Sequence, residues 1–367
     1  MLRRNAARLR TLVAPSRLWP VVKSNAYGHG LIESAAALGG VADGLCVYAA
    51  EEGLALREAG ITMPILVMGP TQPALLEAAH AAGLTVTIWD TGAYRRDLAA
   101  VARRRGTPFP VHVKIDTGVT RFGLDASQAA AAIADLLDDR DIAVRGIFSH
   151  LAAVEEFALG FTLGQFERFD AAPAPIDALL RERGVVRHIA ASAASIVFPQ
   201  ARMDLVRPGI AIYGLWPSAH TQGRAGGSLL LEPALSWRSE LIVVREVEAG
   251  RSVGYGCAYH AARPSRIGVV PIGYAEGVPR AASNTGAVLV AGVRAPIIGR
   301  VCMNVTLIDV TDIPHARPGS RVTLIGRCGD ATIGADDWAT WADTINYEIV
   351  ARLPTTIPRL YADERLG

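Results

Sequence analysis

Lysine is almost absent from this chain, although basic residues are common. Of its 37 lysines and arginines, only Lys23 and Lys114 are lysines. An arginine guanidinium stays protonated in proteins, whereas a lysine amine can lose its proton, attack a carbonyl and form an imine. The two retained lysines are therefore candidates for chemistry. The alternative is that they are ordinary solvated surface residues.

Lys23 lies in the segment VVKSNAYGHG, where two β-branched residues precede the amine and a polar, glycine-rich turn follows it. This pattern is typical of a strand end that delivers a side chain into a site. Other candidate residues follow or end apolar runs in the same way. They are Tyr27, His29, Lys114, Arg121, His150, His188, Ser192, Arg207 and Gly209.

The elements that must position these residues are short apolar runs alternating with helical segments. Eight such runs cover residues 18–22, 45–49, 64–69, 85–89, 110–115, 144–150, 187–192 and 206–212. The intervening segments are rich in Ala, Leu and Arg, and several have helical spacing. Eight consecutive βα units predict a parallel (β/α)8 barrel, whose active groups lie at the C-terminal ends of the strands.

The pattern of apolar, Gly and Pro residues changes after a glycine-rich stretch at residues 223–228. Strand-like runs punctuated by Gly and Pro follow, and long helices are absent until near the end. The predicted fold class is therefore α/β, with a (β/α)8 TIM-type barrel over residues 1–225. A C-terminal all-β domain is expected over residues 226–367.

Composition narrows the class of protein further. Half of the residues are hydrophobic and 20% are charged, which predicts a sizeable core. A net charge of +2 argues against nucleic-acid or membrane-surface partners. The four cysteines are scattered without metal-ligand spacing, so neither a metal site nor a disulfide framework is expected. No secretory signal or long apolar span is evident, and a cytoplasmic enzyme is predicted.

Two small-residue segments follow the last two predicted strands, SAAS at 192–195 and RPGIAIYG at 207–214. Their backbone N–H groups could hold a phosphate, as the corresponding loops of many barrels do. A reactive amine together with a phosphate cradle indicates pyridoxal phosphate as the cofactor. The alternatives are that SAAS only caps a helix and that His188 is a satisfied core histidine.

A set of motifs resembles the alanine racemase family, in the same order along nearly the whole chain. The motifs are VVKSNAYGHG, KIDTGVTRFG, FSHLA, HIAASAAS, VRPGIAIYG, VGYGCAY, PIGYAEGVPR, GRVCMN and INYE. The resemblance implies a pyridoxal-phosphate-dependent isomerase that interconverts L-alanine and D-alanine, the latter for peptidoglycan. It also implies a homodimer with active sites at the subunit interface.

The same resemblance implies roles for individual residues. Lys23 would bind the cofactor and act as one base, and Tyr255 would be the second base, reaching in from the partner subunit. Arg207 would face the pyridine nitrogen, with His150 linking it to Tyr255 and His188 supporting it. The phosphate would be held by Tyr27, Ser192, Gly209, Ile210 and Tyr347. Arg121 and Met303 would meet the substrate carboxylate, and Tyr274 would narrow the opening of the site.

Lys114 matches a family position that is carbamylated in many members, where the new anion would pair with Arg121. The alternative is a strand-end lysine that pairs with Asp116. Two features depart from the family pattern. Asn304 stands where Asp is commoner, and the chain is expected to have a shortened start ahead of the first active-site strand.

Other functions remain open at this point. A decarboxylase of the same architecture would place a carboxylate at the pyridine nitrogen, and Arg207 argues against it. A non-catalytic carrier of pyridoxal phosphate would lack the second domain and Tyr255. Within the racemases, serine or a broader range of amino acids remains a possible substrate set.

Overall fold

The computed structural model describes residues 1–156 and 159–361, which form two compact units. The first unit comprises Met1–Ala26 and Gly30–Glu232, and the second comprises Tyr27–His29 and the chain from Pro233 onward. The short Tyr27–His29 segment, which lies four to six residues after Lys23, therefore groups with the second unit.

The first unit is a closed barrel of eight parallel strands, as the sequence predicted. Six of them form one sheet in the order β2 (Leu45–Val47), β3 (Ile65–Val67), β4 (Thr85–Ile88), β5 (Phe109–Asp116), β7 (Ile142–Phe148) and β8 (Val186–His188). The remaining two, β1 (Arg17–Leu18) and β9 (Leu205–Val206), pair in parallel with each other. A short strand, β6 (Leu124–Asp125), adds to β5.

Backbone contacts close the ring on both sides of the β1–β9 pair. Val21 bridges to Cys46 of β2, and the amide of Asp204 donates to the carbonyl of Arg187 in β8 at 3.1 Å. β2 and β3 are buried at every position, as expected for strands with the barrel interior on one side and helices on the other. The predicted (β/α)8 architecture is confirmed.

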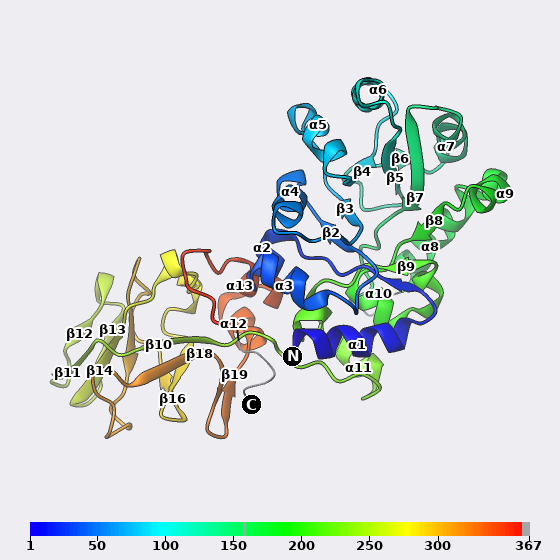
Figure 1. The fold of residues 1–367 in the computed structure, drawn as a ribbon. Helices are drawn as coiled ribbons and strands as arrows, with labels where there is room; N and C mark the ends of the chain where they lie inside the picture. Colours follow the sequence, from blue (N-terminus) through cyan, green and yellow to red (C-terminus); the bar gives the residue numbers. More distant parts are fainter. Residues whose placement is uncertain (157–158, 362–367) are drawn as a thin grey trace. The chain divides into compact units, whose positions relative to one another are not determined.

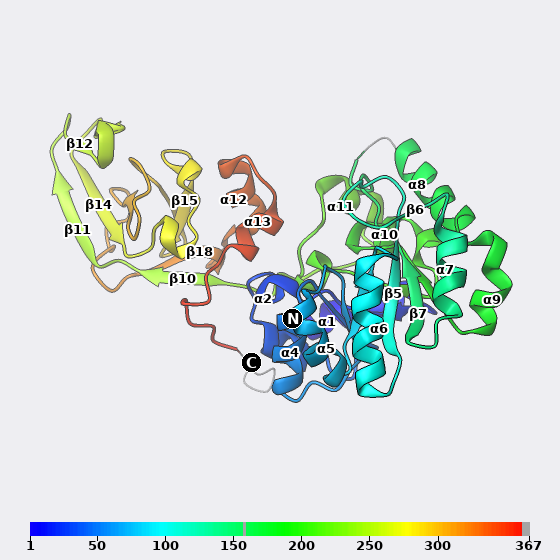
Figure 2. The same ribbon diagram turned by 90° about the horizontal axis from the view of Figure 1, so that it is seen from above.

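Helices surround the strands in chain order, as Figure 1 and Figure 2 show. They are α3 (Leu31–Leu38), α4 (Ala50–Glu58), α5 (Pro73–Ala81), α6 (Ala93–Arg105), α7 (Ala129–Leu137), α8 (Gly160–Ala171), α9 (Asp177–Glu182) and α10 (Ser192–Val197). α8 and α9 come from a segment that reads as one helical stretch. The chain breaks between them at a 3₁₀ turn (Ala174–Ile176) flanked by Pro173 and containing Pro175, because proline has no N–H to continue a helix.

The eighth predicted strand is shorter than expected. The sequence indicated residues 206–212, but only Leu205–Val206 pair as β9, and Ile210–Tyr213 form a 3₁₀ turn. Pro208 cannot donate to a ladder, and the chain curls directly after it. This difference matters for function because it turns the backbone of Gly209 and Ile210 into a loop at the end of the barrel strand.

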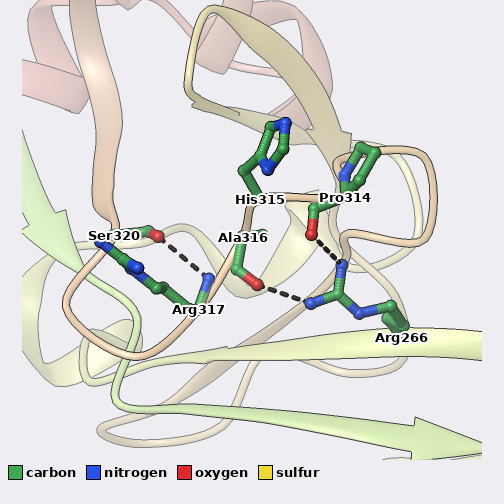
Figure 3. A pocket seen from close by; sticks show the side chains of 6 residues that line it. All are labelled: Arg266, Pro314, His315, Ala316, Arg317 and Ser320. Atoms are coloured by element: carbon green, nitrogen blue, oxygen red, sulfur yellow. Dashed lines mark hydrogen bonds between the residues drawn. The ribbon is translucent and has the colours of Figure 1, made fainter.

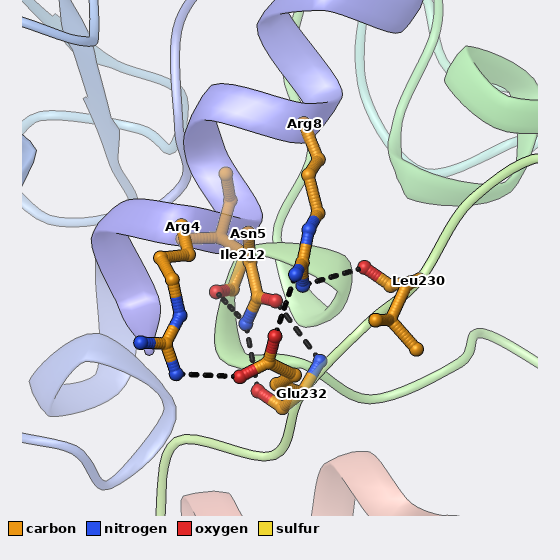
Figure 4. A network of polar contacts seen from close by, with 6 residues as sticks. All are labelled: Arg4, Asn5, Arg8, Ile212, Leu230 and Glu232. Carbon is orange, nitrogen blue, oxygen red and sulfur yellow. Dashed lines mark hydrogen bonds and ion pairs between the residues drawn. The ribbon is translucent and has the colours of Figure 1, made fainter.

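The N-terminal helix α1 (Leu2–Val13) fixes the last segment of the first unit. Figure 4 shows Arg4 and Arg8 converging on the carboxylate of Glu232, each at 2.6 Å. The buried side chain of Asn5 donates to the carbonyls of Glu232 at 2.8 Å and Ile212 at 3.2 Å. These contacts hold the chain as far as Glu232 against the barrel.

The glycine-rich stretch where the sequence placed the domain division is the end of a helix. Helix α11 (Ala219–Ala225) ends at Gly226, whose φ of +57° is the left-handed conformation that favours glycine. Residues 226–232, expected in the second domain, group with the first unit.

The second unit is built from antiparallel strands. One sheet has the order β10 (Trp237–Glu240), β18 (Arg321–Cys328), β15 (Ala287–Val290) and β16 (Val293–Pro296), with β19 (Ala331–Ile333) on β18. A second sheet has the order β11 (Val243–Val247), β14 (Ser265–Val270) and β17 (Thr306–Asp309), and β12 (Ser252–Val253) pairs with β13 (Tyr259–His260). Helices α12 (Ala335–Ala342) and α13 (Asn346–Ala351) follow, so the expected all-β domain with late helices is confirmed.

Trp338 of α12 anchors the helices of this unit. Its side chain is completely buried, and its indole Nε1 donates to the carbonyl of Leu324 in β18 at 2.7 Å. A buried indole needs such a partner, since leaving its N–H unpaired costs free energy. In the part of the chain that the structure describes, no helix is long and apolar enough to cross a membrane.

Candidate active site

Lys23 begins a left-handed turn at the end of the first barrel strand. The next four residues, Ser24, Asn25, Ala26 and Tyr27, have φ between 52° and 54°, a conformation that non-glycine residues rarely adopt. Each such residue costs about 1–2 kcal/mol relative to a right-handed one. Strain of this size persists where the surrounding structure enforces it, and it is concentrated at functional sites.

The carboxylate of Glu52 holds the start of this turn. Its Oε1 accepts the amide of Ser24 at 2.5 Å, and its Oε2 accepts the amides of Tyr48 at 2.9 Å and Ala49 at 3.1 Å. Burial lowers the pKa of the Lys23 amine, and the positive charge of Arg121 lowers it further, while Glu52 opposes both effects. A lowered pKa gives more of the neutral amine, the form that attacks carbonyls.

Lys114 ends up inside the barrel and not on its surface. The side chain is 4% exposed, and its Nζ lies 3.5 Å from the centre of the Phe122 ring. Burial and the nearby charges of Arg121 and Arg207 lower its pKa from 10.5 to about 8. Asp116 turns its Oδ1 to the backbone amides of Gly118 and Thr120, and in residues 1–156 and 159–361 no ion pair joins it to Lys114. The strand-end pair is therefore not formed.

Arg207 follows β9 and is 2% exposed. Its guanidinium donates to the carbonyl of Ser149 at 2.8 Å and contacts Nδ1 of His188 closely. The ring of His188 stacks on Phe148, with ring centres 5.0 Å apart and planes within 3°. Burial, followed by the charge of Arg207, lowers the pKa of His150 to about 3, so this imidazole is neutral at physiological pH.

Ser192 joins the ends of the last two strands. Its Oγ accepts the backbone amides of Gly209 at 2.9 Å and Ala211 at 3.3 Å. A hydroxyl that accepts two hydrogen bonds still has its own O–H to donate. Ser192 is also the first residue of α10, and Ile210 begins the 3₁₀ turn, so the predicted small-residue segments are both present as turns of helix.

The second unit contains the remaining predicted residues. The rings of Tyr27 and Tyr347 lie 6.2 Å apart, centre to centre. Tyr274 and Met303 are neighbours, because the amides of Tyr274 and Ala275 donate to the carbonyls of Cys302 and Met303 at 3.0 and 2.9 Å. Tyr255 lies in the turn Tyr255–Cys257 and is 71% exposed, so its hydroxyl is available to another molecule.

Asn304, the departure from the family pattern, has a defined partner. Its Nδ2 donates to Oε1 of Glu276 at 2.7 Å, and Oε2 of Glu276 accepts the amide of Gly273 at 2.8 Å. An aspartate at position 304 would face this carboxylate with a like charge. The asparagine is therefore complementary to its surroundings in this chain.

Positive charge dominates the strand ends of the barrel. Lys23, Lys114, Arg121 and Arg207 lie in one electrostatic neighbourhood, since their charges shift one another's pKa values or those of shared neighbours. In the described parts of the first unit, none of the four forms an ion pair with a carboxylate. Such a donor set suits an anionic ligand, and together with the lowered pKa of Lys23 it fits a phosphorylated aldehyde.

Sequence reasoning missed His112 and Arg359. His112 lies two residues before Lys114 on β5, so the alternation of a strand could have placed both on one face. Arg359 donates to the carbonyls of Gly28 at 3.0 Å and Leu353 at 2.9 Å, which ties the backbone after Tyr27 to the segment that follows α13. No local pattern in the sequence indicates a contact over that separation.

A cavity of about 630 Å³ in the second unit lies apart from these residues. It is lined by Arg266, Pro314, His315, Ala316, Arg317 and Ser320. Figure 3 shows the guanidinium of Arg266 donating to the carbonyls of Pro314 and Ala316, so its charge holds the loop in place. None of the predicted site residues lines this cavity, and it is not the candidate site.

The fold and the site together define a class of protein. The parallel barrel has a lysine of lowered pKa and a buried arginine at its strand ends, and an antiparallel β domain follows it in the chain. These features agree with the two enzyme classes that the sequence resemblance implied, an amino-acid racemase and a decarboxylase. Comparison with known proteins decides between the two. A family model described as the N-terminal domain of alanine racemase matches residues 1–217, and one described as the C-terminal domain matches residues 234–361.

The chain belongs to the alanine racemase family and is an isomerase. An alanine racemase of Symbiobacterium thermophilum is 40% identical over 364 residues, which cover 99% of this chain and 95% of that protein. An alanine racemase of Salinispora tropica is also 40% identical, with 99% and 96% covered.

Solved structures agree with this assignment. The alanine racemase of Streptomyces coelicolor superposes with a TM-score of 0.90 at 34% identity, covering 99% of this chain and 96% of that one. The alanine racemase of Bacillus anthracis, solved with bound L-Ala-P, gives a TM-score of 0.87 at 32% identity, with 99% and 93% covered.

Proposed function

We propose that this protein interconverts L-alanine and D-alanine with pyridoxal phosphate bound to Lys23, and that the D-alanine serves peptidoglycan synthesis. The observation that carries the proposal is a lysine of lowered pKa in the same barrel as the buried cation Arg207. A permanent cation that faced the pyridine nitrogen would keep this nitrogen unprotonated, and the cofactor would then withdraw electrons less strongly. Side reactions such as transamination should be suppressed as a result.

The residues that would hold the cofactor are present in suitable chemical form. The neutral amine of Lys23 would bond to its aldehyde carbon. The hydroxyl of Ser192, the backbone around Gly209 and Ile210, and the side chains of Tyr27 and Tyr347 would bind its phosphate. When bound, the cofactor supplies an electron-withdrawing ring that acidifies the Cα proton of the amino acid.

Racemisation needs two groups that exchange protons with opposite faces of one carbon. Lys23 would serve one face. Tyr255 would serve the other from the partner subunit of a homodimer, a role consistent with its 71% exposure in the single chain. His150, held neutral next to Arg207, would accept a hydrogen bond from one neighbour and donate one to another, which orients the tyrosine.

Three side chains would orient the substrate. Arg121 and Met303 would meet its carboxylate, and Tyr274 would narrow the opening. Lys114 is proposed to carry a carbamate that pairs with Arg121. The neutral amine that carbon dioxide requires is favoured by the low pKa of Lys114.

The test follows the rotation of polarised light for alanine, serine, lysine and arginine, each offered as the L-form. Racemisation of alanine is expected, and a flat trace for every amino acid from cofactor-loaded protein would overturn the proposal. Lys23→Arg should lose the near-visible absorbance of the bound cofactor. Tyr255→Phe should keep that absorbance and lose turnover, and normal racemisation by this variant would refute the two-base assignment.

The same incubations distinguish the alternatives. Release of carbon dioxide and an amine from L-lysine would indicate a decarboxylase. Faster racemisation of serine than of alanine would indicate a serine racemase. Constant activity per chain on dilution to the monomer would contradict the contribution of Tyr255 across a dimer interface.

A further inference from the structure

The interior of the barrel contains a polar chain that extends beyond the residues assigned above. His112 on β5 is 2% exposed, and its Nδ1 lies 2.8 Å from Nε2 of the fully buried His188. Nδ1 of His188 in turn contacts a guanidinium N–H of Arg207. The three side chains therefore run in series from the barrel interior to Arg207, and His112 is the member without an assigned role.

The chemistry of the three groups allows only one arrangement of protons. An arginine can only donate, so Nδ1 of His188 must accept. A neutral His188 then carries its proton on Nε2 and donates it to His112, whose Nδ1 must accept in turn. A protonated His188 would direct an N–H at Arg207, and the tautomer with its proton on Nδ1 would do the same.

The environment opposes protonation of either ring. Burial, then the charge of Arg207, lowers the pKa of His188 well below its usual value of 6.5. The same two causes, in the same order, lower the pKa of His112 to about 3. Both rings are therefore neutral over the range in which enzymes of this kind operate.

The barrel is shaped around the ring of His112. A Cβ on Gly146 would lie 2.7 Å from its Cε1 and 2.8 Å from its Nδ1, so the glycine is required for space. The pairing of β5 with β7 shifts between Val111 and His112, which places Gly146 opposite the histidine. On another side, the indole of Trp19 stacks on the ring, with centres 6.0 Å apart and planes 28° apart.

We propose that His112 is a positioning residue that fixes the tautomer of His188 and, through it, the guanidinium of Arg207. The inference rests on the proposed function, in which Arg207 faces the cofactor. Removing the acceptor on His112 would leave the Nε2–H of His188 buried and unpaired. His188 would then reorient or change tautomer, and Arg207 would lose a partner.

The direct test is nitrogen NMR of the cofactor-free protein labelled with ¹⁵N-histidine, which reports the protonation of each of its 8 histidines. A coupling across the N–H···N hydrogen bond identifies the His112–His188 pair. We expect both rings to carry the proton on Nε2 and to stay neutral from pH 5 to pH 9. An unperturbed histidine, by contrast, would become protonated within this range, with a pKa of about 6.5. An imidazolium or an Nδ1–H form of His188 at pH 7, or absence of the coupling, overturns the proposal.

Variants then separate positioning from bulk stability. His112→Leu removes the acceptor, and it should shift the His188 resonances and lower kcat about tenfold with little change in KM. His112→Asn keeps an acceptor in the place of Nδ1, so it should restore both the His188 resonances and kcat. Unchanged His188 resonances in His112→Leu would refute the role. If that variant does not fold, Gly146→Ala, which displaces the ring, provides the same comparison.

The matched control is Thr87→Val on β4. Thr87 pairs in register with His112, is fully buried, and donates to the carbonyl of Val67 at 2.7 Å, outside the polar chain. Thr87→Val should lower the free energy of unfolding without shifting the His188 resonances. A shift of these resonances as large as that in His112→Leu would contradict the proposal. The NMR measurements need neither cofactor nor turnover, so they decide the positioning role even if the racemase assignment fails.

Discussion

The most direct test of the site is a proton titration of its two lysines. The chain has only Lys23 and Lys114, so ¹³C-lysine labelling gives two side-chain signals to follow. We expect the Lys114 amine to titrate with a pKa of about 8, whereas the ordinary pKa of a lysine is 10.5. At pH 7.5 a pKa of about 8 leaves about a quarter of the amine neutral, against about 0.1% for a pKa of 10.5.

The assay compares protein kept free of carbon dioxide with protein in ¹³C-bicarbonate. Lys114→Arg assigns the signals, because only Lys23 then remains. In bicarbonate, the large neutral fraction of Lys114 should yield a carbamate signal that is absent from this variant. A Lys114 titration near 10.5 would refute the claim that burial and the charges of Arg121 and Arg207 govern this amine.

The same pKa predicts how stability depends on pH. Because the folded-state pKa lies below that of the unfolded chain, the unfolded state binds more protons between pH 8 and pH 10.5. The free energy of unfolding therefore rises with pH in that window, by about 3 kcal/mol for a pKa difference of about 2.5. Lys114→Met should remove this rise in carbon-dioxide-free urea denaturation, and an identical pH dependence in the two proteins would contradict it.

Three further substitutions have defined outcomes. Gly28→Ala would place a Cβ 2.0 Å from the carbonyl oxygen of Val350 at a φ of +79°, so it should lower stability by about 2 kcal/mol or more, seen as a lower melting temperature. Ser192→Ala leaves the amides of Gly209 and Ala211 without their acceptor and should weaken pyridoxal phosphate binding about tenfold by fluorescence titration; unchanged affinity would count against a phosphate site there. Asn304→Asp opposes Glu276 with a like charge, so the melting temperature should fall at low salt and recover at high salt.

Much of the barrel could be predicted because its strands are buried on both faces and leave apolar runs in the sequence. The runs at 45–49, 64–69 and 85–89 all contain strands of the observed sheet. The run at 206–212 was extended too far, since apolar composition does not distinguish a strand from the buried 3₁₀ turn at Ile210–Tyr213. Pro208 within this run indicates that the strand ends there, because proline cannot donate a hydrogen bond to a neighbouring strand.

Residue types predicted which side chains could react, but they did not predict which residues hold those side chains in place. The scarcity of lysine identified Lys23 and Lys114, both of which have a lowered pKa in the fold. The contacts of His112 with His188 and of Arg359 with Gly28 join positions 76 and 331 residues apart. Such contacts depend on the register of strands and the path of the C-terminus, which a single sequence does not specify.

The excess of positive charge at the strand ends explains why the site suits an anionic cofactor. Two carboxylates raise the pKa of these lysines, Glu52 that of Lys23 and Asp116 that of Lys114, and both are already hydrogen-bonded. Glu52 accepts three backbone amides and Asp116 accepts two. Neither can turn to a lysine or to Arg207 without leaving those amides unpaired. His188 and His150 are neutral and do not cancel the positive charges. A bound phosphate and a carbamate on Lys114 would each neutralise part of this positive charge, and each would lower the potential that attracts the other. Bicarbonate should therefore weaken pyridoxal phosphate binding at low salt, and Lys114→Met should abolish that effect.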